Sequence, residues 1–78
     1  QQEFDMANAL YAVVIDGNQW RISHNGQLFD RYPTEAAAVA AARTTAEAAV
    51  AAGFETRVVV ETANGGFRVE WNSADAPA

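Results

Sequence analysis

An alanine-rich stretch in the middle of the chain, TEAAAVAAARTTAEAAVAAG from Thr34 to Gly53, constrains the fold more than any other feature. Its composition predicts one helix, because alanine has the highest intrinsic helix propensity. We expect Thr34 to cap the start, since its hydroxyl can accept a hydrogen bond from a free N–H group of the first turn. We expect Gly53 to end the helix, because glycine adopts the left-handed conformation of a helix C-terminus without steric cost.

The helix is predicted to be only weakly amphipathic. Residues at helical spacing form its buried face: Val39, Ala42, Ala46, Ala49 and Val50. Its outer strip is also small and apolar, and consists of Ala37, Ala40, Ala41, Ala48 and Ala51. Small side chains let a helix lie close to a sheet, and in a chain of 78 residues only the flanking strands can form the second layer.

Three segments before the helix are predicted to form a strand meander. Leu10 to Ile15 is continuously apolar, as expected for a central strand. A loop at Asp16 to Gln19 leads to the second strand, and Asn25-Gly26 predicts a tight hairpin to the third, which ends at Tyr32 before a proline. The predicted pairs are Ile15 with Trp20, Val13 with Ile22, Tyr11 with His24, His24 with Gln27, Ile22 with Phe29, and Arg21 with Asp30.

Two more strands follow the helix. They span Thr56 to Glu61 and Phe67 to Trp71, and a turn at Thr62 to Gly66 joins them. This turn predicts that Val60 pairs with Val69, Val58 with Trp71, and Glu61 with Arg68. Trp20 and Trp71 would then lie under the helix, in the core.

The predicted fold class is α+β, with one helix packed on a five-stranded, mostly antiparallel sheet. The element order is β-β-β-α-β-β, and a right-handed crossover places the fourth strand parallel to the first, giving the strand order 3-2-1-4-5. Residues 1–5 are interpreted as a cloning remnant, residues 6–72 as the single domain, and residues 73–78 as a disordered tail.

Composition restricts the possible partners. The formal net charge of −5 opposes attraction to nucleic acids and anionic membranes. The chain has no cysteine and no apolar run of the roughly 20 residues that span a bilayer. We therefore expect a cytoplasmic protein without a membrane partner.

No catalytic, cofactor-binding or metal-binding constellation is recognisable. Ser23 and His24 are adjacent on a strand, so their side chains point to opposite faces and cannot exchange a proton. The five glycines match no phosphate-binding spacing. The sequence therefore predicts neither an enzyme nor a cofactor.

The sheet face away from the helix is the candidate binding face. It is predicted to carry arginines interleaved with apolar residues: Arg21, Arg57, Arg68, Val14, Leu28 and Val59. Asp30, Glu61 and Glu70 are expected among them, so a solvated face of self-paired charges is the alternative.

In this arrangement the chain resembles a family of small bacterial domains of unknown function. The matching motifs are Asp16-Gly17, Trp20-Arg21-Ile22, the helix start at Thr34-Glu35-Ala36-Ala37, and the strand from Val58 to Val60 followed by Gly65-Gly66. This resemblance implies the fold and supplies no activity.

Two further resemblances carry function. The first three strands and the helix look like the arm-type DNA-binding domain of tyrosine integrases, although that group is basic. The same elements with a parallel fourth strand are similar to HicB-type antitoxins, although their P-D-L-P-G-C-like segment is missing here. The sequence thus predicts a non-enzymatic protein-interaction module that can self-associate through the helix strip or the open face, with a nucleic-acid-binding domain as the alternative.

Overall fold

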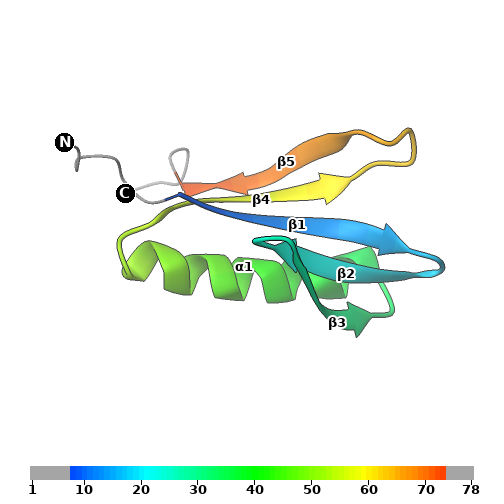
Figure 1. The fold of residues 1–78 in the computed structure, drawn as a ribbon, viewed down its shortest axis with the longest axis horizontal. Helices are drawn as coiled ribbons and strands as arrows, with labels where there is room; N and C mark the ends of the chain where they lie inside the picture. The colour runs from blue at the N-terminus through cyan, green and yellow to red at the C-terminus, as the bar shows by residue number, and fades with distance from the viewer. Residues whose placement is uncertain (1–7, 74–78) are drawn as a thin grey trace.

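The computed structural model describes residues 8–73, and the predicted cloning remnant and residues 74–78 of the predicted tail lie outside this range. The chain forms five strands and one helix: β1 (Asn8–Asp16), β2 (Gln19–His24), β3 (Gln27–Tyr32), α1 (Glu35–Ala51), β4 (Glu55–Glu61) and β5 (Phe67–Asn72). The strands form one sheet, and α1 lies along one of its faces (Figure 1).

The predicted fold class and strand order are confirmed. The sheet has the order β3-β2-β1-β4-β5. β1 and β4 are parallel, and the other neighbouring strands are antiparallel. The helix connects β3 to β4 across the sheet, so the chain folds into two layers, with one sheet face covered and the other open (Figure 1).

The helix ends are those that the sequence predicts. The Thr34 hydroxyl accepts a hydrogen bond from Ala37 N at 3.1 Å, and Gly53 follows the helix with a φ of 101°. On the buried face, however, Ala38, Ala42 and Ala46 are fully buried, and Val50 is exposed. Each step of four residues along a helix overshoots one full turn by about 40°. Val50 is three such steps from Ala38, so its side chain is rotated away from the sheet.

The core is small and built largely from valine and alanine. Val13, Val58 and Val60 are its largest fully buried side chains. Trp20 and Trp71 are partly buried and pack against this core, which confirms their predicted position under the helix. Ser73, which the sequence assigns to the tail, accepts a hydrogen bond from Thr56 N at 3.0 Å and so is tied to β4.

The register at the centre of the sheet is also as predicted. Val13 pairs with Ile22, and Ile15 with Trp20. The first loop is shorter than expected, because Asp16 pairs with Gln19. In the second hairpin Asn25 and Gly26 both have positive φ, at 53° and 77°, which is the backbone that the Asn-Gly turn predicts.

The outer end of β3 departs from the predicted register. Ile22 pairs with Phe29 as expected, but a bulge follows and Arg21 pairs with Arg31, so the predicted pair of Arg21 with Asp30 is wrong. The extra residue is Asp30, whose φ is 29°. The bulge brings Tyr32 opposite Trp20, where it packs against the core.

A second bulge changes β5. Val58 pairs with Trp71 as predicted, but Val59 pairs with Val69, Val60 with Arg68, and Glu61 with Phe67. The predicted pairs of Val60 with Val69 and of Glu61 with Arg68 are therefore wrong by one residue. The five-residue turn shifts the pairs next to it by one residue from the predicted pairs. The bulge then returns the strand to the predicted pairing, so that Trp71 reaches the core.

Candidate interaction surface

The candidate site is the open face of the sheet, the side not covered by α1. Side chains of adjacent strands form rows across this face. The ladder aligns the central row on five neighbouring strands: Val69, Val59, Ala12, Ser23 and Leu28. Four of these five residues are apolar, so the middle of the open face is apolar.

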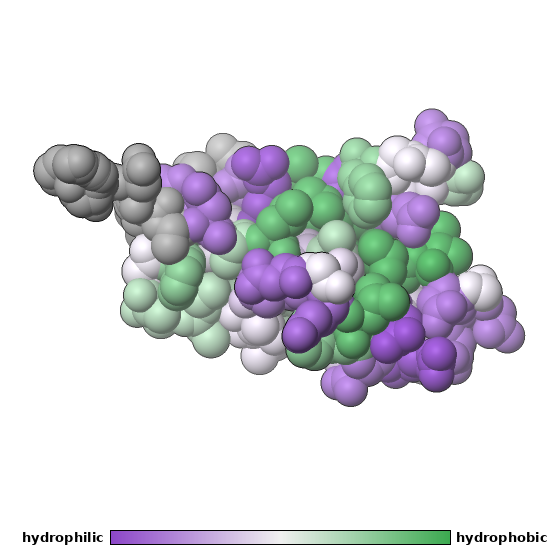
Figure 2. Space-filling model, viewed as in Figure 1, coloured by the Kyte–Doolittle hydropathy of each residue, from purple (hydrophilic) through white to green (hydrophobic). Residues whose placement is uncertain are grey.

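Large apolar side chains protrude from this face. Leu10, Leu28, Phe67 and Val69 are 51 to 55% exposed. Figure 2 shows apolar side chains gathered over β1, β4 and β5, with hydrophilic residues around them. These four residues, together with Val14 and Val59, are referred to below as the open-face patch. An exposed apolar patch rimmed by polar residues is typical of an interaction site.

Charged groups lie at the edges of the patch. Arg57 is exposed, and within residues 8–73 it has no ion-pair partner. Glu61, four residues further along β4, accepts a hydrogen bond from Ile15 N at 2.9 Å through one carboxylate oxygen. At the other side, Arg31 pairs with Asp16 at 3.2 Å, and Arg21 Nη2 lies 3.5 Å from Leu28 O.

Arg68 is not part of this face. Because it pairs with Val60, it points to the helix side, where its guanidinium lies 2.5 Å from Glu35 and 3.1 Å from Glu70. The hydrogen bonds that Arg68 donates, first to Glu35 and second to Glu70, raise the pKa of its guanidinium above its ordinary value. The placement of Arg68 and Glu70 on the open face is therefore wrong, and the β5 register is the reason.

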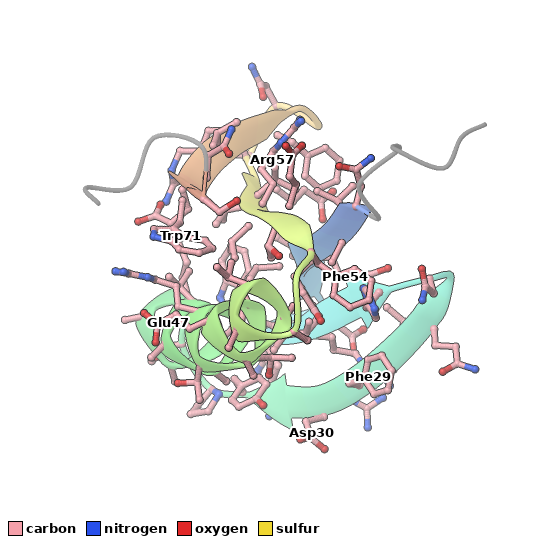
Figure 3. The ribbon with its side chains drawn as sticks, turned by 90° about the vertical axis from the view of Figure 1, so that its left-hand side faces the viewer. Phe29, Asp30, Glu47, Phe54, Arg57 and Trp71 are labelled. Carbon is pink, nitrogen blue, oxygen red and sulfur yellow. The ribbon has the colours of Figure 1, made fainter. Side chains whose placement is uncertain are left out.

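The view along the helix separates the two sides of the sheet. In Figure 3, Trp71 lies on the side of α1, and Arg57 projects from the sheet away from the helix. The Arg43 guanidinium of α1 lies 5.7 Å from the centre of the Trp71 ring, so the tryptophan is held between the helix and the core.

His24 is held by its own neighbours. One ring nitrogen, Nδ1, lies 3.1 Å from Leu10 O, and Nε2 lies 3.3 Å from the Asn25 side-chain nitrogen. The imidazole also stacks on Tyr11, with ring centres 4.2 Å apart. Among residues 8–73, no group of three potential metal ligands comes together. This arrangement assigns His24 a structural position at the hairpin.

A hollow of about 250 Å³ lies between α1 and the β2-β3 hairpin. It is lined by Tyr11, Ile22, His24, Phe29, Asp30, Tyr32 and Thr45. The Tyr32 hydroxyl donates to Asp30 at 3.4 Å, and burial, with Asp30 as the second cause, raises the pKa of Tyr32 above its usual value. Pockets for organic ligands usually measure about 300 to 1,000 Å³, so this hollow is smaller than a usual ligand pocket.

Comparisons with protein families, curated proteins and solved structures give no match. The resemblances to small bacterial domains, integrase arms and HicB-type antitoxins therefore stay predictions. Within residues 8–73, no helix has the length and apolar character needed to cross a membrane.

Sequence reasoning found most of this surface and missed its aromatic part. Arg21, Arg57, Val14, Leu28 and Val59 lie on the predicted face, and the sheet brings the last three together with Leu10. The predicted pair of Val60 with Val69 places Val69 on the helix side, and Phe67 with it by alternation, whereas both lie on the open face. The five-residue turn, which Thr62 N closes by donating to Gly66 O at 2.8 Å, is the local signal for the observed pairing.

Proposed function

We propose that this protein is a non-enzymatic protein-interaction module that binds its partner through the open-face patch. The observation that carries the proposal is the β5 register, which brings Phe67 and Val69 onto the same face as Val59. Aromatic and aliphatic side chains at the centre of a surface, with charged groups at its edge, form the usual composition of a protein interface.

Binding of a partner removes the apolar side chains of the open-face patch from water. Covering apolar surface stabilises a complex by about 25 cal/mol for each Å² removed from water. Phe67 and Val69 are more than half exposed in the single chain, so a partner can bury most of each side chain. A small domain whose core consists mainly of valine and alanine gains stability from such a partner, which supports binding as the role of this face.

The non-enzymatic part of the proposal is supported by His24. General acid–base catalysis needs a titratable group directed at a substrate, and both ring nitrogens of His24 are engaged within the protein. We propose a cytoplasmic location, and a chain without cysteine is compatible with that reducing compartment.

Site-specific photo-cross-linking in the protein's own cells tests the proposal. Phe67 is replaced by p-benzoylphenylalanine, which keeps an aromatic ring on the open face. We expect a discrete protein adduct on irradiation, which disappears when Val69→Asp is added, because a charge there opposes burial of the patch.

The matched control carries the same photoreactive residue at Ala40, on the exposed side of α1. We expect no discrete adduct from this position. Equal protein adducts from both positions, or none from position 67, would contradict the assignment of the open face.

Nucleic-acid binding through Arg21 and Arg57 is the other function that this experiment can reveal. An adduct with nucleic acid at position 67 would favour it over the protein module. Arg68 is turned to the helix side, and Arg31 is paired with Asp16. The remaining two arginines limit the slope of log affinity against log salt concentration to about 2. We expect random oligonucleotides to bind no tighter than ~100 μM at low salt, because the net charge is −5.

A further inference from the structure

We infer that the partner of the open-face patch is a second copy of this chain, stacked back to back on the same face with two-fold symmetry. This inference rests on the proposed function and specifies it. Three observations support it: the order of charges along β4, the alignment of rows on the neighbouring strands, and the size of the face.

The charges on β4 are placed symmetrically about an apolar residue. Arg57, Val59 and Glu61 point to the open face at successive alternate positions of the strand. Val59 therefore lies midway between a positive and a negative group. On β1, Leu10 lies beside Arg57 and Ala12 beside Val59, while Val14 follows in the direction of Glu61.

A two-fold axis through the Val59 row, parallel to the sheet and perpendicular to β4, makes this arrangement self-complementary. Rotation about this axis places Arg57 over Glu61 of the second copy, and Glu61 over Arg57 of the second copy. It also places Val14 over Leu10 of the second copy, so apolar groups meet. An axis along β4 would instead place Arg57 over Arg57 and Glu61 over Glu61, and like charges repel.

Glu61 can take part without losing its present contact. One of its carboxylate oxygens accepts from Ile15 N, and a carboxylate has a second oxygen that can accept from a guanidinium. Arg57 has no ion-pair partner within residues 8–73. The second copy therefore supplies the acceptor that the single chain does not.

The face is large enough for a weak dimer. Strands lie about 4.8 Å apart and rise about 3.3 Å per residue, so five strands of about six residues cover roughly 480 Å². Two copies together cover roughly 1,000 Å², near the lower limit of a biological interface. Two aligned sheets pack about 10 Å apart, with their strands at an angle of about 30°. Arginine and glutamate side chains are long enough to meet across this distance. We expect a dissociation constant of roughly 1 to 100 μM.

Light scattering after size-exclusion chromatography, at tenfold dilution steps, measures the mass. The wild-type chain should approach twice 8.4 kDa at high concentration and 8.4 kDa on dilution. The double variant Phe67→Ser with Val69→Thr should weaken the dimer by about tenfold or more, since these two side chains are the most exposed apolar groups of the patch and lose apolar area that the dimer buries. Ala40→Ser with Ala48→Ser, on exposed positions of α1, is the matched control and should leave the mass unchanged.

Charge reversal tests the symmetry itself. Arg57→Glu and Glu61→Arg each place like charges opposite one another in the homodimer, so each should weaken self-association by about tenfold or more. Mixing the two variants restores two attractive pairs and should produce a mixed dimer. Within one chain the two positions are four residues apart on a strand, about 13 Å, so recovery on mixing must come from contacts between chains.

Circular dichroism establishes that each variant is folded. If Glu61→Arg fails to fold because Ile15 N loses its acceptor, Arg57→Glu is mixed with Glu61→Gln instead, which keeps an acceptor oxygen. In this mixture the reversed position faces a neutral amide, so a dimer stronger than that of Arg57→Glu alone is expected. No recovery in either mixture would overturn the symmetry.

Monomeric mass at high micromolar concentration would overturn the inferred second copy. The proposed function would then be judged separately by the cross-link at position 67: an adduct with a different protein retains the interaction module, and no adduct removes both.

Discussion

The two outer strands of the sheet, β3 and β5, contain the same irregularity and use it differently. Each has a bulge of one residue. The bulge of β3 lies opposite Arg21 and Ile22 of β2, and the bulge of β5 lies opposite Val58 and Val59 of β4. In both strands the bulge brings an aromatic residue opposite a core strand, Tyr32 in β3 and Trp71 in β5. The aromatic residue reaches the core in both cases, so core packing determines where the extra residue is inserted.

The consequences on the open face are opposite. In β3 the bulge leaves Arg31 beside Arg21, and Arg31 pairs with Asp16, so this edge of the face is charged. In β5 the residues between the turn and the bulge keep the register of the turn, with Arg68 towards the helix and Phe67 and Val69 on the open face, so this edge is apolar. The turn register and one inserted residue per strand therefore decide together whether alternating residues build a core, a charged rim or a binding patch.

The largest expected effect distinguishes the two aromatic residues of β5. Trp71→Ala should lower the free energy of unfolding by about 2 to 3 kcal/mol, because a partly buried tryptophan loses its packing against the core. Phe67→Ala should change it by less than about 0.5 kcal/mol, because the ring is exposed in the single chain. Urea unfolding at low protein concentration measures both, and equal losses would contradict the β5 register.

A smaller effect distinguishes the two bulge regions. Glu70→Gly should cost about 0.5 to 1 kcal/mol, since glycine weakens a strand with ordinary φ and the exposed ion pair with Arg68 is lost. Asp30→Gly should stay within about 0.5 kcal/mol of the wild type, because glycine takes the φ of 29° without strain. Thermal unfolding of both variants is the measurement, and Asp30→Ala is the control, with an expected loss of about 1 kcal/mol.

The charged groups of the two sheet faces should differ in their response to salt. Arg68→Ala removes the ion pairs with Glu35 and Glu70, so it should lower the thermal midpoint at low salt and have less effect at high salt. Arg57→Ala should leave the midpoint of the monomer unchanged. Scanning calorimetry at two ionic strengths compares them, and a greater loss for Arg57→Ala would show that the assignment of the faces is reversed.

The smallest effect concerns Tyr32, the aromatic residue of β3. Its pKa is raised in the folded protein, by burial and then by Asp30, so the neutral hydroxyl is favoured by folding. By linkage, this stabilisation is complete below the ordinary tyrosine pKa of about 10 and is lost as the pH rises through the higher folded value. Unfolding measured from neutral to alkaline pH should show a steeper decline for the wild type than for Tyr32→Phe. Identical declines would remove Tyr32 as the cause.

The sequence by itself determined the elements, their order and the fold. The alanine-rich stretch with Thr34 and Gly53 at its ends defines the helix, and Asn25-Gly26 sets the register of the second hairpin, because these signals act over only a few residues. From them follow the strand order and most of the open face, including Val14, Leu28 and Val59.

Only the tertiary structure decided which side chains of the outer strands face the helix. In the stretch from Phe67 to Trp71, apolar and charged residues alternate, and this pattern does not show which set faces the helix. A shift of one residue in the pairing moves every side chain of the strand to the other face of the sheet. The shift was fixed by distant groups: Trp71 packs against the core, and Arg68 pairs with Glu35 at the start of the helix. On β5 the five-residue turn sets which side chains next to it face outward, and the bulge then lets Trp71 reach the core. The need for a bulge comes from the core, and no local sequence signal contains it.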